Sequence, residues 1–211
     1  MVEKLNGPKG SPASNGDDLV SNSLDEHSRT FDALIEVCSE AIRECGELLI
    51  STVKKGGKVL ICGNGGSAAD AQHIAAEFVG RYETERIALP AIALTTDTSA
   101  LTALANDYSF ERVFSRQVEA LASEGDCLIA ISTSGNSPNV LAAVMSARKR
   151  GCCIVGMTGA KGKKLAGLSD AVLMVPSERT ARIQEAHITS AHIWCEMVDA
   201  AYSDPKKERT A

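Results

Sequence analysis

The sequence predicts an α/β fold in which helices flank both faces of a doubly wound, five-stranded parallel sheet. Short apolar runs rich in β-forming residues alternate with turns and with segments of helical periodicity. The runs are far enough apart to be joined by crossover helices, which parallel strands require. The predicted strands are 58–62, 91–95, 127–132, 152–157 and 171–175.

One long helix and two terminal tails are expected around this repeat. Residues 1–26 are rich in Gly, Pro, Ser, Asn and Asp, and they contain few large apolar side chains to offset the entropy of ordering, so a flexible tail is predicted. From His27 to Val53, apolar residues recur at helical spacing. This N-terminal helix is expected to pack on the sheet or to contact another subunit. A single domain is predicted at 27–204, followed by a short tail at 205–211.

Composition limits the classes of function. The chain has 211 residues, 44% of them hydrophobic, and a net charge of -5. This length fits one domain with a substantial core, and the acidic balance offers no footprint for nucleic acid. Neither an 18-residue apolar run nor a charged-then-apolar leader is evident, so we expect a cytoplasmic protein that does not enter the membrane. Seven cysteines without C-x-x-C spacing are expected to be reduced core residues.

Two strand ends carry signals for anion binding. The first predicted strand leads into GNGGS at 63–67, where glycines permit a tight turn and Ser67 could cap the next helix. The third leads into STSGNSP at 132–138, with Ser137 expected as the N-cap and Pro138 at the first helical position. Backbone N–H groups and hydroxyls at a helix N-terminus stabilise an anion. Both turns are therefore predicted to hold phosphate.

The first turn also matches two nucleotide-binding patterns only in part. Gly63 begins a G-x-G-x-x-A sequence, but Glu83 and Glu85 precede the second strand instead of closing it. No lysine precedes Ser67, as a G-x-x-x-x-G-K-[ST] loop would require. The two serine- and glycine-rich turns suit the single phosphate of a sugar ester. For either turn by itself, a simple capped turn is the alternative.

Helical spacing brings candidate reactive groups together on two helices. His73 and Glu77 are four residues apart after the first turn, so they share one helix face. Gln184 and His192 form a similar row on the last helix. His187 is turned about 140° from His192, at about 100° per residue, and is expected to be structural. Spacing alone also fits a surface His/Glu contact and a packed Gln/His row.

Four segments together resemble the sugar isomerase (SIS) domain family, and within it the phosphoheptose isomerases. They are CGNGGSAADAQH at 62–73, ANDY at 105–108, ISTSGNSPNV at 131–140 and RIQEAHITSAHIWCEMVD at 182–199. The resemblance covers about residues 30–202 and implies a flavodoxin-like fold. It also implies an enzyme that interconverts sedoheptulose 7-phosphate and D-glycero-D-manno-heptose 7-phosphate through an enediol, at the start of bacterial ADP-heptose and lipopolysaccharide core synthesis.

The resemblance assigns roles to individual residues. It implies Glu77 and His192 as the acid/base pair, and one Zn²⁺ per active site held by His73, Glu77, Gln184 and His192. Zinc accepts such a set of two imidazoles and two oxygen donors, although a glutamine ligand is unusual. For Asp107, a capping or turn role is the alternative to a substrate contact. The substrate contacts implied are Asn64, Gly65, Gly66, Ser67, Glu77, Asn106, Asp107, Ser132, Thr133, Ser134, Ser137 and Gln184.

The family further implies a homotetramer with sites between subunits, and one alternative function stays open. A non-enzymatic regulator of this fold, which binds the replication initiator protein, shares the patterns TERxxLPAIALxTD and RIQE with this chain. That regulator lacks the carboxylate matching Glu77 and the histidine matching His192. Because this chain has both, the sequence favours the enzyme. Transcription regulators of this fold are disfavoured, because no helix-turn-helix segment precedes residue 27.

Overall fold

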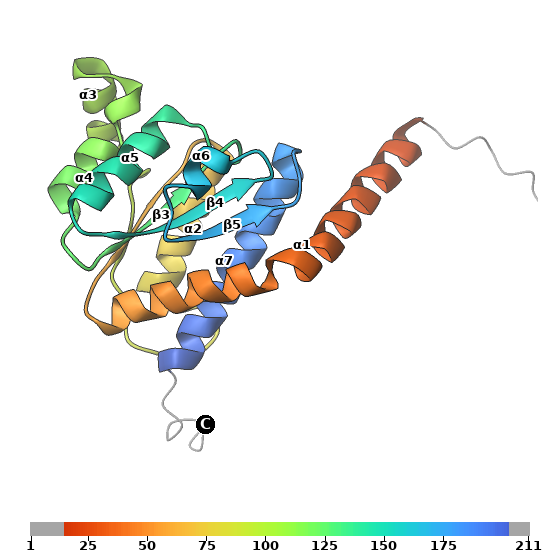
Figure 1. Cartoon of the computed structure of the whole chain (residues 1–211), viewed down its shortest axis with the longest axis horizontal. Coiled ribbons are helices and arrows are strands. Elements are labelled where there is room, and N and C mark those ends of the chain that lie inside the picture. Colours follow the sequence, from red (N-terminus) through yellow and green to blue (C-terminus); the bar gives the residue numbers. More distant parts are fainter. Residues whose placement is uncertain (1–14, 203–211) are drawn as a thin grey trace, which may run out of the picture.

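A parallel sheet lies between two layers of helices in the computed structural model, which describes residues 15–202 (Figure 1). The strand order is β2-β1-β3-β4-β5 and each neighbouring pair is parallel, which confirms the predicted doubly wound, flavodoxin-like fold. The elements are α1 (Asn15–Lys54), β1 (Val59–Cys62), α2 (Gly66–Val79), β2 (Ala91–Ala93), α3 (Thr98–Asp107), η1 (Phe110–Arg112), α4 (Ser115–Leu121), β3 (Cys127–Ile131), α5 (Pro138–Lys149), β4 (Cys153–Gly159), α6 (Lys163–Ala166), β5 (Ala171–Val175) and α7 (Thr180–Tyr202).

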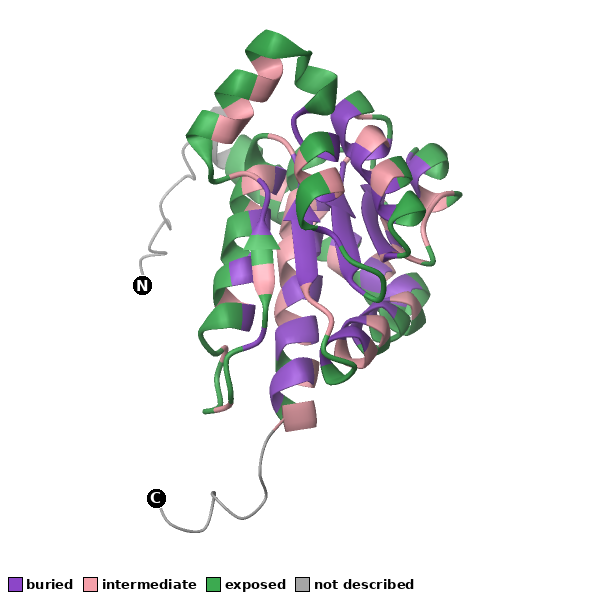
Figure 2. Ribbon diagram, turned by 90° about the vertical axis from the view of Figure 1, so that its left-hand side faces the viewer, coloured by how far each residue is buried: buried purple, intermediate pink, exposed green. Residues whose placement is uncertain are grey.

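Burial explains why the strands were recognisable as apolar runs. Every residue of β1 and β3 is buried, because helices cover both faces of the sheet (Figure 2). The edge strands β2 and β5 are only partly buried. Strand β5 has its predicted bounds, whereas β2 ends at Ala93 and β4 extends to Gly159. The extension of β4 pairs with β5, where Gly159 is opposite Val175.

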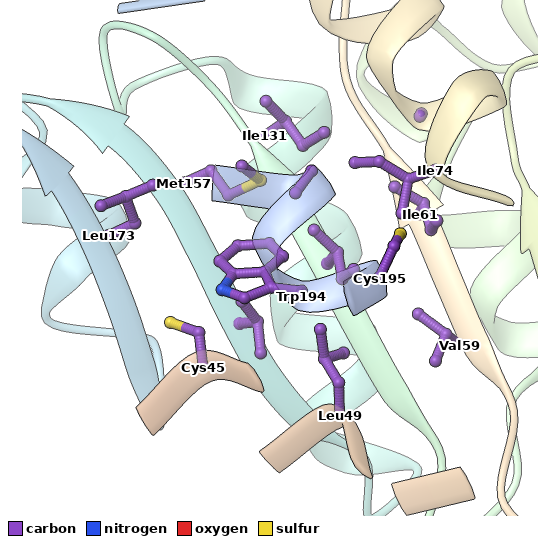
Figure 3. Close-up of a cluster of buried hydrophobic side chains, with 14 of the residues drawn as sticks. Cys45, Leu49, Val59, Ile61, Ile74, Ile131, Met157, Leu173, Trp194 and Cys195 are labelled. Carbon is purple, nitrogen blue, oxygen red and sulfur yellow. The ribbon is translucent and has the colours of Figure 1, made fainter. Parts of the chain in front are cut away.

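The two helical layers enclose separate cores. Helices α1, α2 and α7 cover one face of the sheet, and α3 to α6 cover the other. Trp194 of α7 is fully buried in the first core, near Cys45 and Leu49 of α1 (Figure 3). Its indole Nε1 donates a hydrogen bond of 2.8 Å to the backbone oxygen of Ile42. This contact fixes α7 against both α1 and the sheet.

Helix α1 begins earlier than predicted. The composition of residues 15–26 indicated a tail, but the structure continues the helix through them. From Ser23 onward contact with α7 supports it, because Arg182 donates to the backbone oxygen and to the hydroxyl of Ser23. Of the predicted tails, residues 1–14 and 205–211 lie outside the described part of the chain.

The cysteines follow the sequence prediction. All seven are free thiols, and only Cys153 is less than fully buried. Burial raises the pKa of Cys62 and of Cys195 to about 12, so both stay protonated at neutral pH. Within residues 15–202, no helix is both long enough and apolar enough to span a membrane.

The core between α1 and the sheet gives the first prediction. Leu49 is 0% exposed, so Leu49→Ala should lower the free energy of unfolding by about 2–5 kcal/mol through lost burial and a residual cavity. Met145→Ala, at a side chain that is 47% exposed, should change it by less than about 1 kcal/mol. Urea unfolding at one fixed protein concentration measures both. Equal effects of the two substitutions would contradict this core.

Candidate active site

A cleft opens where the turns after β1 and β3 lie side by side. Because these strands are neighbours and parallel, their carboxyl ends meet at the switch point of the sheet. The helices that follow, α2 and α5, both begin there. The cleft therefore lies at two helix N-termini, as the sequence predicted. It is lined by Asn64, Gly65, Gly66, Ser67, Ile131, Ser132, Thr133, Ser137, Thr180 and Gln184.

Hydroxyls gather in the second turn. The Oγ atoms of Ser132 and Ser137 are 2.9 Å apart, and those of Ser132 and Ser134 are 3.5 Å apart. Ser137 is the N-cap of α5 and Pro138 follows it, as predicted. The Ser137 hydroxyl makes no capping hydrogen bond to the helix. It therefore faces its neighbouring serine at the positive end of α5, where it can serve an anion.

The first turn differs from its prediction in one detail. Helix α2 begins at Gly66 with Gly65 as the N-cap, so Ser67 is a buried residue of the first turn and not the cap. Gly65 has φ of 56°, a conformation that glycine adopts without strain. A Cβ at Gly66 would lie 2.3 Å from the amide nitrogen of Gln184. The glycine thus lets α7 bring Gln184 against the turn.

A pair of amides joins the two turns. Asn64 donates to the side-chain oxygen of Asn139 at 2.9 Å, and Asn139 donates back to that of Asn64 at 2.8 Å. Asn139 is buried in the first turn of α5, whereas Asn64 is partly exposed in the cleft. The sequence analysis identified Asn64 but missed Asn139. The reciprocal pair holds the two N-termini at a fixed spacing.

Helices α2 and α7 bring three predicted reactive side chains together. His73 Nε2 lies 3.1 Å from Glu77 Oε1, and His192 Nε2 lies 3.4 Å from His73 Nε2. The two imidazole rings meet edge to face, with centroids 5.0 Å apart and an interplanar angle of 71°. Glu77 and His192 are partly buried, whereas His73 is more exposed. A carboxylate and two imidazoles in contact can transfer protons or hold a metal.

Two separations within this cluster are close to those between the ligands of a zinc ion. Tetrahedral zinc with bonds of about 2.0–2.1 Å sets its ligand atoms about 3.3 Å apart. The separations of 3.4 Å between His73 and His192 and of 3.1 Å between His73 and Glu77 fit two such edges. Within the described residues, no group of three or more His, Cys, Asp or Glu side chains is arranged to hold a metal ion. Two of the separations therefore suit tetrahedral zinc, and the zinc site itself stays a prediction.

Gln184 lies apart from this cluster. It is eight residues before His192 on the same helix, a rise of about 12 Å. Its amide lies at Gly66 in the cleft. Its role as a fourth ligand stays a prediction. The structure does bring it to the turn after β1, so α7 connects the cleft with the His/Glu cluster.

The remaining predicted site residues lie at the margin or elsewhere. Ser134 lines an adjoining hollow with Lys161 and Glu178. Asn106 and Asp107 are exposed at the end of α3, where the Asn106 amide donates to Asp107 at 2.9 Å. Neither lines the cleft in this chain. Their substrate contacts stay predictions.

Two residues beside the cluster escaped sequence analysis. Asp70 lies one turn before His73, and burial, opposed by the nearby His73, raises the pKa of its carboxyl to about 6. The ring of Tyr82 stacks on that of His192, with centroids 5.4 Å apart. The spacing of Asp70 and His73 in DAQH was a usable signal for the first. Tyr82 lies in an irregular loop, where no periodicity points to it.

His187 is the buried histidine of α7, as predicted. It is 0% exposed, and its Nε2 lies 3.3 Å from the backbone oxygen of Thr158. Burial lowers the pKa of His187 to about 4, so its ring is neutral at pH 7. It is a core residue and not part of the cluster.

Comparison with known proteins agrees with this geometry. The SIS domain model matches residues 24–159. A phosphoheptose isomerase from Aliarcobacter butzleri is 57% identical over 173 residues, which cover 82% of this chain and 92% of that protein. The structure of phosphoheptose isomerase GmhA from Neisseria gonorrhoeae has a TM-score of 0.82 and 46% identity, and the match covers 87% of this chain and 98% of that one.

A second solved structure extends the match. A phosphoheptose isomerase from Francisella tularensis has a TM-score of 0.85 and 36% identity, and the match covers 89% of this chain and 100% of that one. These relatives give no support to the alternative of a replication regulator. The chain therefore belongs to the SIS domain family and, within it, to the phosphoheptose isomerases.

Proposed function

We propose that this chain is an aldose-ketose isomerase that interconverts sedoheptulose 7-phosphate and D-glycero-D-manno-heptose 7-phosphate. The observation that carries the proposal is the placement of two groups of side chains along α7. The phosphate turns meet Gln184, and the His73–Glu77–His192 cluster lies two turns further along the helix. One end of a sugar phosphate can be gripped while the other meets acid/base groups.

The proposed chemistry needs two proton transfers across C1 and C2. In the ketose-to-aldose direction, Glu77 removes a proton from C1 while His192 donates one to the C2 oxygen, which gives the enediol. The hydroxyl on C1 then loses its proton and C2 gains one, which gives the aldose. Binding of the distant phosphate in the cleft orients the reacting carbons.

We propose one Zn²⁺ per site as the cofactor, with His73, Glu77 and His192 as ligands and Gln184 as the fourth. Two ligand separations close to a tetrahedral edge support it. When bound, the ion supplies Lewis-acid polarisation of the carbonyl and stabilises the enediolate charge. Each imidazole and carboxylate offers two donor atoms, so a residue can serve the metal through one and still carry a proton on the other.

A homotetramer is the proposed assembly, with sites completed between subunits. Leu19, Val20, Leu24, Ile35 and Val37 of α1 are 61–68% exposed in the single chain. Apolar side chains on one long helix are suited to burial against another copy. We further propose that the enzyme works in the cytoplasm, at the start of the pathway to ADP-heptose for lipopolysaccharide.

The proposed mechanism predicts the effect of replacing the Glu77 carboxylate with an amide. Glu77→Gln keeps the size of the side chain but removes the base, so turnover of sedoheptulose 7-phosphate should fall about 10²- to 10⁴-fold. NMR in deuterated water follows aldose formation and exchange at the reacting carbons together. Glu124→Gln, in the exposed loop before β3, is the matched control and should leave both rates unchanged. Wild-type exchange in Glu77→Gln would rule out this mechanism.

Metal removal is the second test of the site. Protein treated with a chelator and confirmed by elemental analysis to be metal-free should lose activity at least tenfold, because the developing oxyanion loses its Lewis acid. Added Zn²⁺ should restore the rate. Full turnover by verified metal-free protein would contradict the zinc assignment.

The assembly has a direct measurement. Light scattering on the eluting protein should give about 89 kDa, four times the chain mass of 22.2 kDa. Leu24→Glu should lower this mass, because it places a charge on an apolar interface. A wild-type mass of one chain at micromolar concentration would exclude the tetramer.

A further inference from the structure

The loop between α2 and β2, residues 80–90, has no regular secondary structure, yet a buried ion pair fixes it. Arg86 Nε and Asp199 Oδ1 are 2.8 Å apart, and the two side chains are 1% and 4% exposed. Asp199 also accepts hydrogen bonds from the backbone N–H groups of Glu83 and Thr84, at 2.8 and 2.9 Å. A desolvated, fully hydrogen-bonded pair of this kind holds its geometry strongly.

The same arginine closes the end of helix α2. Arg86 Nη2 donates to the backbone oxygen of Glu77 at 2.6 Å, and Nη1 donates to that of Phe78 at 2.9 Å. These carbonyls lie in the last turn of α2, where intrahelical partners run out. The loop, the end of α2 and helix α7 are therefore joined at one buried point. Each of them carries a residue of the reactive cluster or a neighbour of it.

Tyr82 is the residue of this loop that contacts the His73–Glu77–His192 cluster. It directly precedes the two N–H groups that Asp199 binds. Its ring is partly buried and stacks on the His192 imidazole with an interplanar angle of 26°. That imidazole also contacts the His73 ring, with centroids 5.0 Å apart and an interplanar angle of 71°. The His192 ring thus contacts two rings, one from helix α2 and one from the loop that follows it.

We propose that Tyr82 is a positioning residue for proton transfer by His192. Its ring fixes the plane of the imidazole, and the Arg86–Asp199 pair fixes Tyr82. An imidazole on a helix turns about two side-chain bonds, and a stacked face removes most of that freedom. The effect rests on the ring face and not on the phenol hydroxyl. The inference rests on the proposed isomerase function, because it concerns the acid/base role of His192.

Two substitutions distinguish the contribution of the Tyr82 ring to kcat from that of its hydroxyl. Tyr82→Leu should lower kcat about tenfold with KM nearly unchanged, since misplacement of a reacting group costs rate and not phosphate binding. Tyr82→Phe keeps the ring face and should stay within about twofold of the wild-type kcat. Phe110→Leu, at an exposed aromatic residue of η1, is the control for loss of a ring and should leave kcat unchanged.

A second readout reports the stack without turnover. The His192 ring protons should be shifted by the ring current of Tyr82 in the NMR spectrum of the metal-free protein. Tyr82→Leu should remove that shift, and Tyr82→Phe should keep it. Asp199→Asn, which retains an acceptor oxygen, should reduce both the ring-current shift and kcat. The double variant with Tyr82→Leu should have a kcat only slightly below that of Tyr82→Leu alone.

The outcomes separate this inference from the function on which it rests. Wild-type protein that does not turn over sedoheptulose 7-phosphate would remove the proposed function and this role with it. An active wild type in which Tyr82→Leu keeps full kcat would overturn the positioning role alone. A Tyr82→Phe variant as impaired as Tyr82→Leu would also overturn it, because the hydroxyl would then be the important group.

Discussion

The burial of Trp194 is the contact on which the site depends. Its indole lies in the core between α1 and the sheet and donates to the Ile42 backbone oxygen. Helix α7 is thereby fixed near its middle. That one contact sets the positions of both Gln184 in the cleft and His192 in the His/Glu cluster. Earlier on the helix Gln184 reaches the turn after β1, and just before Trp194 His192 contacts His73 of α2. Because cores transmit displacement, a shift at this contact moves both ends of the site together.

The cleft can attract an anion without a charged side chain. Its lining consists of glycine, hydroxyl and amide residues together with Ile131. The chain as a whole carries a net charge of -5, so long-range attraction does not favour phosphate. The positive ends of α2 and α5 supply the local field instead, held together by Asn64 and Asn139. The cleft lining has no charged side chain, whereas the His/Glu cluster at the other end of the site contains the carboxylate of Glu77.

The sequence predicted what local patterns encode. Apolar runs indicated the strands, the Ser137–Pro138 pair indicated the start of α5, and four-residue spacing placed His73 with Glu77. Contacts between distant segments were not predictable in this way. The early start of α1 depends on α7, and Tyr82 is placed by Asp199, more than a hundred residues away. Composition alone made the first of these look like a tail, and no local pattern pointed to the second.

Helix α7 also shows how one element serves the core and the site. Five residues separate His187 from His192, a rotation of about 140°. The first faces Thr158, is fully buried, and has its pKa lowered to about 4, so it stays neutral within the core. The second contacts His73 and Tyr82 and is only partly buried. The two side chains are chemically identical, and the helical period places one in the core and the other in the His/Glu cluster.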